Sequence, residues 1–210
     1  MIDETTRHRS TFWRELPVLL GVAIVVAILV RAFILQTFYI PSESMEHTLN
    51  INDRVLVNKL VYDFRDPRRG EIIVFTAPAE WKSDPTETDF IKRVIGIGGD
   101  HVKCCSGGKL TINGGQLDEP YLNADDGPDL PAAPEQFDIV VPKGRLWVMG
   151  DNRYHSGDSR DQYNRTNHDI ERSTIPVGSV IGRAFVTFWP VNRADWLAIP
   201  SGFNAIPPPA

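Results

Sequence analysis

The sequence predicts a mostly β protein, with one antiparallel β-sheet domain behind a single N-terminal transmembrane helix. Three observations predict it: one long apolar segment, a series of short runs rich in Val, Ile and Phe, and turn residues between those runs. The chain has 210 residues, 42% of them hydrophobic and 23% charged, which is typical of a globular protein and excludes wholesale disorder. A net charge of −5 provides no basic surface for nucleic acid, so we expect no nucleic-acid partner.

The apolar segment covers residues 16–35 and contains one charge, Arg31. As a helix it would be roughly 30 Å long, the thickness of a bilayer's hydrocarbon core. It lacks the polar face of a buried core helix, and no small-x-small pair follows it where a signal peptide would be cleaved. We therefore expect an uncleaved anchor over residues 16–35, after a cytoplasmic N-terminus over residues 1–15.

Three arginines, Arg7, Arg9 and Arg14, closely precede the anchor. The positive-inside rule places such residues in the cytoplasm. The expected topology is then single-pass in the plasma membrane, with the domain on the extracytoplasmic face. The lipid bilayer is an expected partner.

After the anchor, the apolar runs are short and are bounded by Gly, Pro, Asn and Asp, which is typical of strands in a sandwich or barrel. The predicted strands cover residues 54–62, 71–76, 90–97, 138–141, 145–149 and 177–189. They predict one domain over residues 36–191, with a less regular insertion at about 104–136 and a short C-terminal tail over residues 192–210.

The two cysteines, Cys104 and Cys105, are adjacent, so they can form only a strained vicinal disulfide that ties no distant segments together. The sequence assigns them no role. It contains neither H-E-x-x-H nor C-x-x-C, and the aspartates between positions 151 and 161 do not follow the spacing of a calcium loop. We expect no metal and no cofactor.

One charged residue, Lys92, lies inside an apolar run, with Ile91 before it and Val94 shortly after. If its side chain points inward, burial lowers the pKa of the amine and provides a general base near neutral pH. A serine hydroxyl needs such a base to act as a nucleophile, and Ser–Lys pairs are a known solution. The alternative is that Lys92 points outward as an ordinary solvated residue.

Three segments together resemble the type I signal peptidases, membrane-bound Ser–Lys endopeptidases that remove signal peptides from exported proteins. They are residues 40–49 (IPSESMEHTL), 90–100 (FIKRVIGIGGD) and 150–160 (GDNRYHSGDSR). The resemblance extends in order through residues 52–59, 69–75 and 181–184, and residues 104–136 carry little of it. It implies a signal-peptidase-like fold without a cofactor, acting on signal peptides of secreted pre-proteins. Cleavage would follow Ala-x-Ala sites through an acyl-enzyme, close to the secretion translocon.

The resemblance also implies roles for single residues. Ser44 matches the nucleophile, Lys92 the general base, and Ser42 the side-chain donor of the oxyanion hole. Ser156 matches the serine that orients the lysine, and the residues that brace the site are Asp158, Arg160 and Arg93. Residues matching the walls of the substrate pockets are Phe38, Ile40, Met45, Leu49, Phe90, Ile91, Val148 and Met149.

Two positions depart from the family pattern, since His47 and Gly98 stand where many members have Pro. Both are loop positions and concern local rigidity rather than chemistry. His47 follows Ser44 by three residues and is an alternative base. Two other interpretations are an inactive anchored module that captures extended peptides, and a self-cleaving repressor-type peptidase. The latter would need a DNA-binding module where this chain has its apolar segment.

Overall fold

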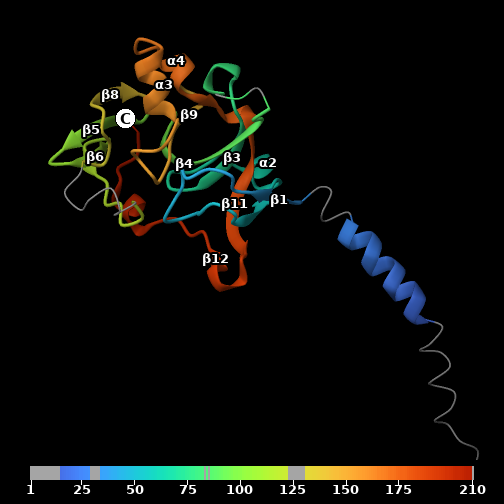
Figure 1. Cartoon of the computed structure of the whole chain (residues 1–210). Helices are drawn as coiled ribbons and strands as arrows, with labels where there is room; N and C mark the ends of the chain where they lie inside the picture. Colours follow the sequence, from blue (N-terminus) through green and yellow to red (C-terminus); the bar gives the residue numbers. More distant parts are fainter. Residues whose placement is uncertain (1–14, 29–33, 83, 85, 123–130, 210) are drawn as a thin grey trace, which may run out of the picture.

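The computed structural model describes residues 15–28, 34–82, 84, 86–122 and 131–209, and its strands form two antiparallel sheets (Figure 1). The larger sheet contains β1 (Leu35–Tyr39), β2 (Arg54–Asn58), β3 (Ile72–Thr76), β4 (Asp89–Ile97), β9 (Arg145–Met149), β10 (Ile175–Pro176), β11 (Val180–Trp189) and β12 (Asp195–Trp196). The smaller contains β5 (His101–Ser106), β6 (Lys109–Ile112), β7 (Gly115–Gln116) and β8 (Phe137–Val140). The prediction of a mostly antiparallel β domain is confirmed.

In the larger sheet the strand order is β1-β2-β11-β3-β4-β9-β10, with β12 paired to β11; in the smaller it is β7-β6-β5-β8. Strand β4 therefore lies between β3 and β9 and is buried along most of its length. The short helices are α2 (Val61–Phe64), α3 (Ser159–Arg165) and α4 (Ile170–Ser173), and 3₁₀ turns lie at η1 (Ala79–Trp81), η3 (Val177–Ser179), η4 (Val191–Arg193) and η5 (Ser201–Ala205).

The predicted strand over residues 54–62 ends early, at Asn58. The side-chain oxygen of Asn58 accepts hydrogen bonds from the backbone amides of Leu60 and Val61, which turns the chain into α2. The insertion at 104–136 is more regular than expected, because it includes half of β5 and all of β6 and β7. Gly107 and Gly108 both have positive φ and close the β5–β6 hairpin, as a tight two-residue turn requires.

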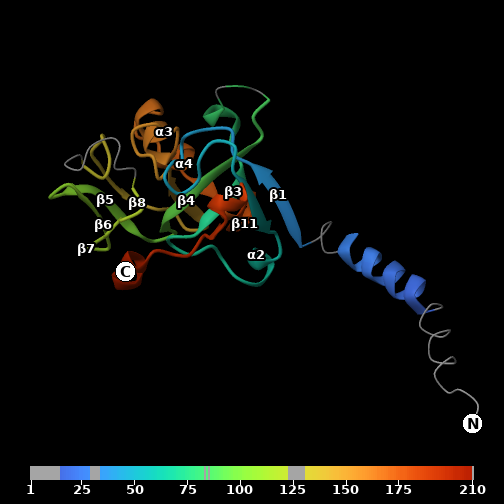
Figure 2. The same ribbon diagram turned by 60° about the horizontal axis from the view of Figure 1, so that its bottom comes forward.

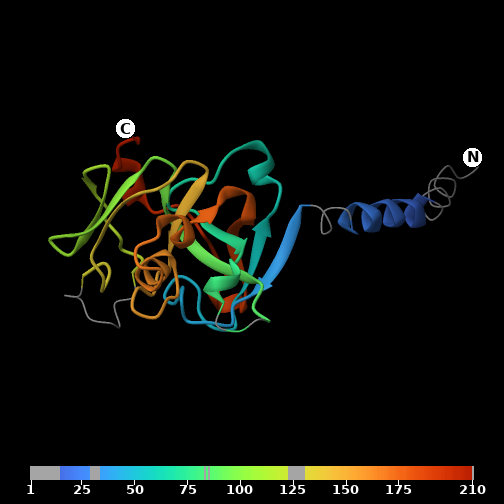
Figure 3. The same ribbon diagram turned by 90° about the horizontal axis from the view of Figure 1, so that it is seen from above.

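The C-terminal residues, predicted as a short tail over residues 192–210, pack into the domain. Strand β12 pairs with β11, and Phe203 and Ile206 belong to a core cluster that also contains residues of both sheets. The side chain of Asn113 donates to the carbonyl oxygen of Pro207, and the C-terminal segment lies beside the smaller sheet (Figure 2 and Figure 3). The two sheets are thus joined through a shared core.

Residues 15–28 form a helix whose side chains are all exposed (Figure 1). Within the described residues, no helix is both long and apolar enough to span a bilayer. Residues 29–33 of the predicted anchor, with Arg31, and residues 1–14 with the three arginines lie outside the described part of the chain. The predicted anchor end at residue 35 is wrong, since Leu35 begins β1 and pairs with Asn58 of β2.

Candidate active site

The candidate site forms where the turn between β1 and β2 meets strand β4. Ser44 lies on that turn and Lys92 on β4, and both are buried. The amine Nζ of Lys92 donates to the hydroxyl Oγ of Ser44 at 2.6 Å. Lys92 therefore points inward, and the outward alternative is wrong. Two residues 48 apart in sequence form the pairing that a serine nucleophile requires.

The surroundings of Lys92 lower the pKa of its amine, which allows the amine to act as a base. Burial is the largest influence and lowers its pKa from 10.5 to about 8. The negative charges of Asp158, Asp151 and Glu87 act in the opposite direction and keep the pKa from falling further. A neutral amine is then accessible near physiological pH, as general-base catalysis requires.

The other two serines of the predicted site behave differently from each other. The Oγ of Ser42 lies 3.3 Å from the Oγ of Ser44. Ser156 lies beside Gly150, near the backbone carbonyl of Ser44. Its buried Oγ has no hydrogen-bond partner among the described residues. The expected hydrogen bond from Ser156 to Lys92 is therefore not formed. Its Oγ instead packs against Gly150, where an added Cβ would overlap it.

Arg93 braces the site from the opposite face of β4. Its guanidinium forms two hydrogen bonds with Asp151, Nε to Oδ1 at 2.8 Å and Nη2 to Oδ2 at 2.5 Å, and a third with the carbonyl of Gly70 at 2.9 Å. Asp151 also accepts from Thr48 Oγ1 at 2.5 Å, which ties the turn of Ser44 to the segment after β9. Asp151 and Thr48 were not among the predicted site residues.

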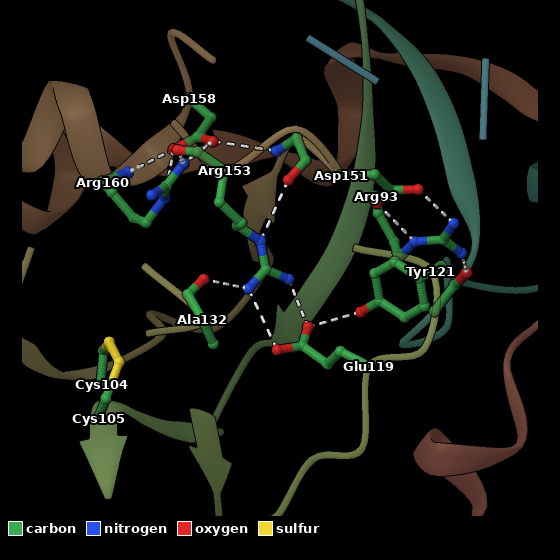
Figure 4. A network of polar contacts seen from close by, with 12 residues as sticks. Arg93, Cys104, Cys105, Glu119, Tyr121, Ala132, Asp151, Arg153, Asp158 and Arg160 are labelled. Atoms are coloured by element: carbon green, nitrogen blue, oxygen red, sulfur yellow. Dashed lines mark hydrogen bonds and ion pairs between the residues drawn. A yellow bond between two sulfur atoms is a disulfide. The ribbon is translucent and has the colours of Figure 1, made fainter. Parts of the chain in front are cut away.

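Asp158 and Arg160 form a second buried pair beside the site (Figure 4). Asp158 is the N-cap of α3 and accepts from the backbone amide of Gly150 at 2.9 Å. Burial alone would raise the pKa of Asp158, but Arg160 and the Gly150 amide hold it below its usual range. Asp158 is therefore a fixed negative charge facing Lys92.

A cleft opens beside Ser44 and Lys92. Four of the predicted wall residues line it, namely Phe38, Ile40, Phe90 and Ile91. The other four are fully buried in the core and do not line it, namely Met45, Leu49, Val148 and Met149. The cleft also contains side chains that the sequence did not single out: Val74, Trp81, Glu43, Glu87 and Asp89.

His47, the alternative base, lines a separate pocket with Arg93 and Tyr121 and not the cleft. Its φ of 79° lies in the left-handed region, which proline cannot adopt because its ring fixes φ near −65°. At Gly98 an added Cβ would press on the backbone of Lys143, so glycine provides space there. Within the described residues, no cluster of three or more His, Cys, Asp or Glu could hold a metal ion.

Known proteins similar to this chain are peptidases. The model of the family described as "Signal peptidase, peptidase S26" matches residues 13–189. "Probable signal peptidase I-2" of Synechocystis sp. is 41% identical over 201 residues, which cover 94% of this chain and 84% of that protein. "Signal peptidase I" of Mycobacterium tuberculosis is 37% identical over 227 residues, covering 91% of this chain and 77% of its own length. A solved signal peptidase I from Enterococcus faecalis is 26% identical, with a TM-score of 0.41, and covers 57% of this chain and 97% of that one.

Proposed function

The chain belongs to the signal peptidase S26 family and removes signal peptides, and we propose that it does so through an acyl-enzyme formed on Ser44, with Lys92 as the general base. The observation that carries the proposal is the 2.6 Å contact between Lys92 Nζ and Ser44 Oγ in a buried site. An inactive peptide-binding module would not need this pair.

In the first half of the reaction, neutral Lys92 accepts the proton of Ser44 Oγ, and the oxygen attacks the carbonyl carbon of the scissile bond. The negative charge that develops on the carbonyl oxygen would be stabilised by the hydroxyl of Ser42 and the backbone N–H of Ser44. Such a donor is worth about 2.7–4 kcal/mol in comparable sites. The amine of the mature protein then leaves with the proton from Lys92, and water releases the signal peptide from Ser44 by the same route.

The cleft supports a substrate with small side chains. Phe38, Ile40 and Ile91 provide apolar walls, and signal peptides end in small-x-small sequences such as Ala-x-Ala. Strand β1 is an edge strand of the larger sheet and contributes Phe38 to the cleft. An extended signal peptide can therefore pair its main chain along this edge. Main-chain hydrogen bonds would provide affinity that depends little on the sequence of the signal peptide.

Membrane anchoring is part of the same proposal. The support is the apolar segment that begins at residue 16, its exposed helical part over residues 15–28, and the arginines before it. The anchor would end before Leu35, leave the N-terminus in the cytoplasm and hold the cleft on the extracytoplasmic face. There the apolar core of a signal peptide is embedded in lipid, near the translocon that delivers it.

A serine-acylating, mechanism-based probe tests the proposal. We expect it to label the full-length protein at Ser44, identified by mass spectrometry of the labelled peptide. Ser44→Ala should take up no label, whereas Ser42→Ala should still be labelled at Ser44 but more slowly, because only the oxyanion donor is lost. Labelling at another serine, or equal labelling of Ser44→Ala, would contradict the proposal.

The pH dependence tests the identity of the base. Only the neutral amine of Lys92 accepts a proton, and its pKa is about 8. We expect kcat/KM to rise roughly tenfold per pH unit up to about 8 and then to level off. Glu87→Gln removes a negative charge that raises this pKa and should move the midpoint to lower pH. The matched control is Glu80→Gln in the same loop, which should leave the midpoint unchanged. A midpoint near the usual histidine value of about 6.5 would contradict Lys92 as the base.

A further inference from the structure

A buried ionic network extends from the candidate active site into the insertion that carries little of the family resemblance. Its centre is Arg153, whose side chain is 3% exposed, paired with Glu119, which is equally buried. Figure 4 shows the guanidinium of Arg153 in contact with Glu119 and Ala132. Neither residue forms a hydrogen bond with Ser44 or Lys92 in the described structure, so neither takes part in the proton transfer between that pair.

Arg153 joins three segments of the chain. Its Nε donates to the carbonyl of Gly150 at 3.1 Å, in the segment that follows β9. Its Nη1 donates to the carbonyl of Ala132 at 2.5 Å and to Glu119 Oε2 at 3.1 Å, and Nη2 makes a shorter bond to Glu119 Oε1. Glu119 and Ala132 both belong to the insertion. The guanidinium therefore fastens the segment after β9 to the insertion.

The same segment holds the nucleophile. The backbone N–H of Asn152 donates to the carbonyl oxygen of Ser44 at 3.2 Å. Gly150 is so close to this carbonyl that an added Cβ would overlap it. A shift of residues 150–152 would therefore move the backbone of Ser44, and with it the Oγ that must stay within reach of Lys92.

Glu119 is itself held in place from the other side. The hydroxyl of Tyr121 donates to Glu119 Oε1 at 2.6 Å, and the ring of Tyr121 lies 4.1 Å from the guanidinium of Arg93. The insertion thus contacts both arginines next to Asp151, Arg93 through a ring face and Arg153 through a carboxylate. Among the described residues, Glu119 is the only carboxylate hydrogen-bonded to Arg153, and the charge of Asp151 acts on the guanidinium without such a bond. When Glu119 is neutralised, the buried guanidinium loses its direct partner and is expected to move or draw in water.

We propose that Glu119 is a positioning residue for signal-peptide cleavage: through Arg153 it fixes the segment 150–152 that holds the Ser44 carbonyl. The inference rests on the proposed function, because it assigns Glu119 a part in keeping Ser44 aligned with its base. Misplacement of a reacting group by about 1 Å can cost about 10²-fold in rate. The insertion over residues 104–136 then helps to hold the active site in place.

The test compares Glu119→Gln with Asp118→Asn in the full-length protein, using a pre-protein with an Ala-x-Ala site. Both substitutions remove one negative charge from neighbouring positions, but the Asp118 side chain is 74% exposed and pairs only with Lys109 among the described residues. We expect Glu119→Gln to lower kcat by about 10²-fold with little change in KM, and Asp118→Asn to match the parent. Glu119→Asp, which keeps the charge, should recover part of kcat.

A purely structural role for Glu119 predicts another outcome. The melting temperature of Glu119→Gln would fall, but its kcat would equal that of the parent once activity is divided by the amount of folded protein. Circular dichroism below the melting temperature gives that amount. This result would overturn the proposal. If Glu119→Gln does not fold, Tyr121→Phe decides, since it removes only the donor to Glu119 and keeps the ring beneath Arg93. Lower kcat at unchanged KM supports the proposal, and unchanged kcat refutes it.

Ser44→Ala in the same assay separates this inference from the function on which it rests. If Ser44→Ala is inactive and Glu119→Gln is normal, the positioning role alone is refuted. If Ser44→Ala still cleaves the pre-protein, the acyl-enzyme proposal fails and the positioning role fails with it.

Discussion

Lys92→Met is expected to abolish cleavage of a pre-protein, lowering kcat/KM by about 10⁴-fold or more. The substitution removes the amine that donates to Ser44 Oγ at 2.6 Å, a distance suited to proton transfer; the other contact of this Oγ among the described residues is the Ser42 hydroxyl at 3.3 Å. Met keeps most of the side-chain volume in a buried position, so the protein should stay folded. The measurement is cleavage of an Ala-x-Ala pre-protein by the full-length protein, with circular dichroism as the check on folding.

The control for this experiment is His47→Asn, which removes the alternative base. Asn is chosen because His47 has a positive φ of 79°, a conformation that Asn adopts more readily than Ala does. His47 does not line the cleft, so this variant should cleave like the parent. The opposite pattern, an active Lys92→Met and an inactive His47→Asn, would make histidine the base.

The central pair could be predicted because residues 40–49 and 90–100 resemble the serine and lysine segments of the signal peptidases. Lys92 stands in an apolar run, and inward burial of its amine gives a Ser–Lys pair a physical basis. Strand alternation alone could not decide between the two faces of β4, because a single β-bulge shifts the pattern. The decision came from Ser44, since its turn packs over the same face and the two side chains meet.

The sequence could not show which of the predicted wall residues expose their side chains to the cleft and which are buried behind it. Matching positions to a family identifies which side chains lie near a site, but their exposure depends on how the neighbouring strands pack. Ile40 and Met45 are almost equally buried, yet Ile40 lines the cleft and Met45 does not. The same limit applies to Ser156, whose buried Oγ lies against Gly150 and has no hydrogen-bond partner among the described residues.

The supporting network was out of reach for a different reason. Glu119 and Arg153 are 34 residues apart, and nothing in either local pattern indicates that they are paired. Glu119 belongs to the insertion, where strands are short. Strand β6, for example, has only four residues, which is too few for a clear strand pattern in the sequence. Buried ion pairs between distant segments become visible only once the two sheets are placed together.

Gly150→Ala is the second substitution with a large expected effect. A Cβ at this position would overlap the carbonyl oxygen of Ser44 and the Oγ of Ser156, and the first of these is backbone that cannot rotate away. Either Ser44 or the segment 150–152 must shift. We expect kcat/KM to fall by about 10²-fold through misalignment of Ser44 with Lys92. Overpacking of this kind also destabilises by about 1–3 kcal/mol, which a thermal melt would detect.

Gly178→Ala is the matched control, because the added Cβ meets nothing within 4 Å and no positive φ restricts that position. It should leave both cleavage and the melting temperature close to the parent values. Labelling of Gly150→Ala with the serine-acylating probe then locates the defect, since slow labelling places it in the formation of the acyl-enzyme. Full kcat/KM in Gly150→Ala would mean that Ser44 tolerates movement of the segment 150–152. Glu119 could then not affect cleavage by fixing the segment 150–152 through Arg153, even though each hydrogen bond between these residues is formed.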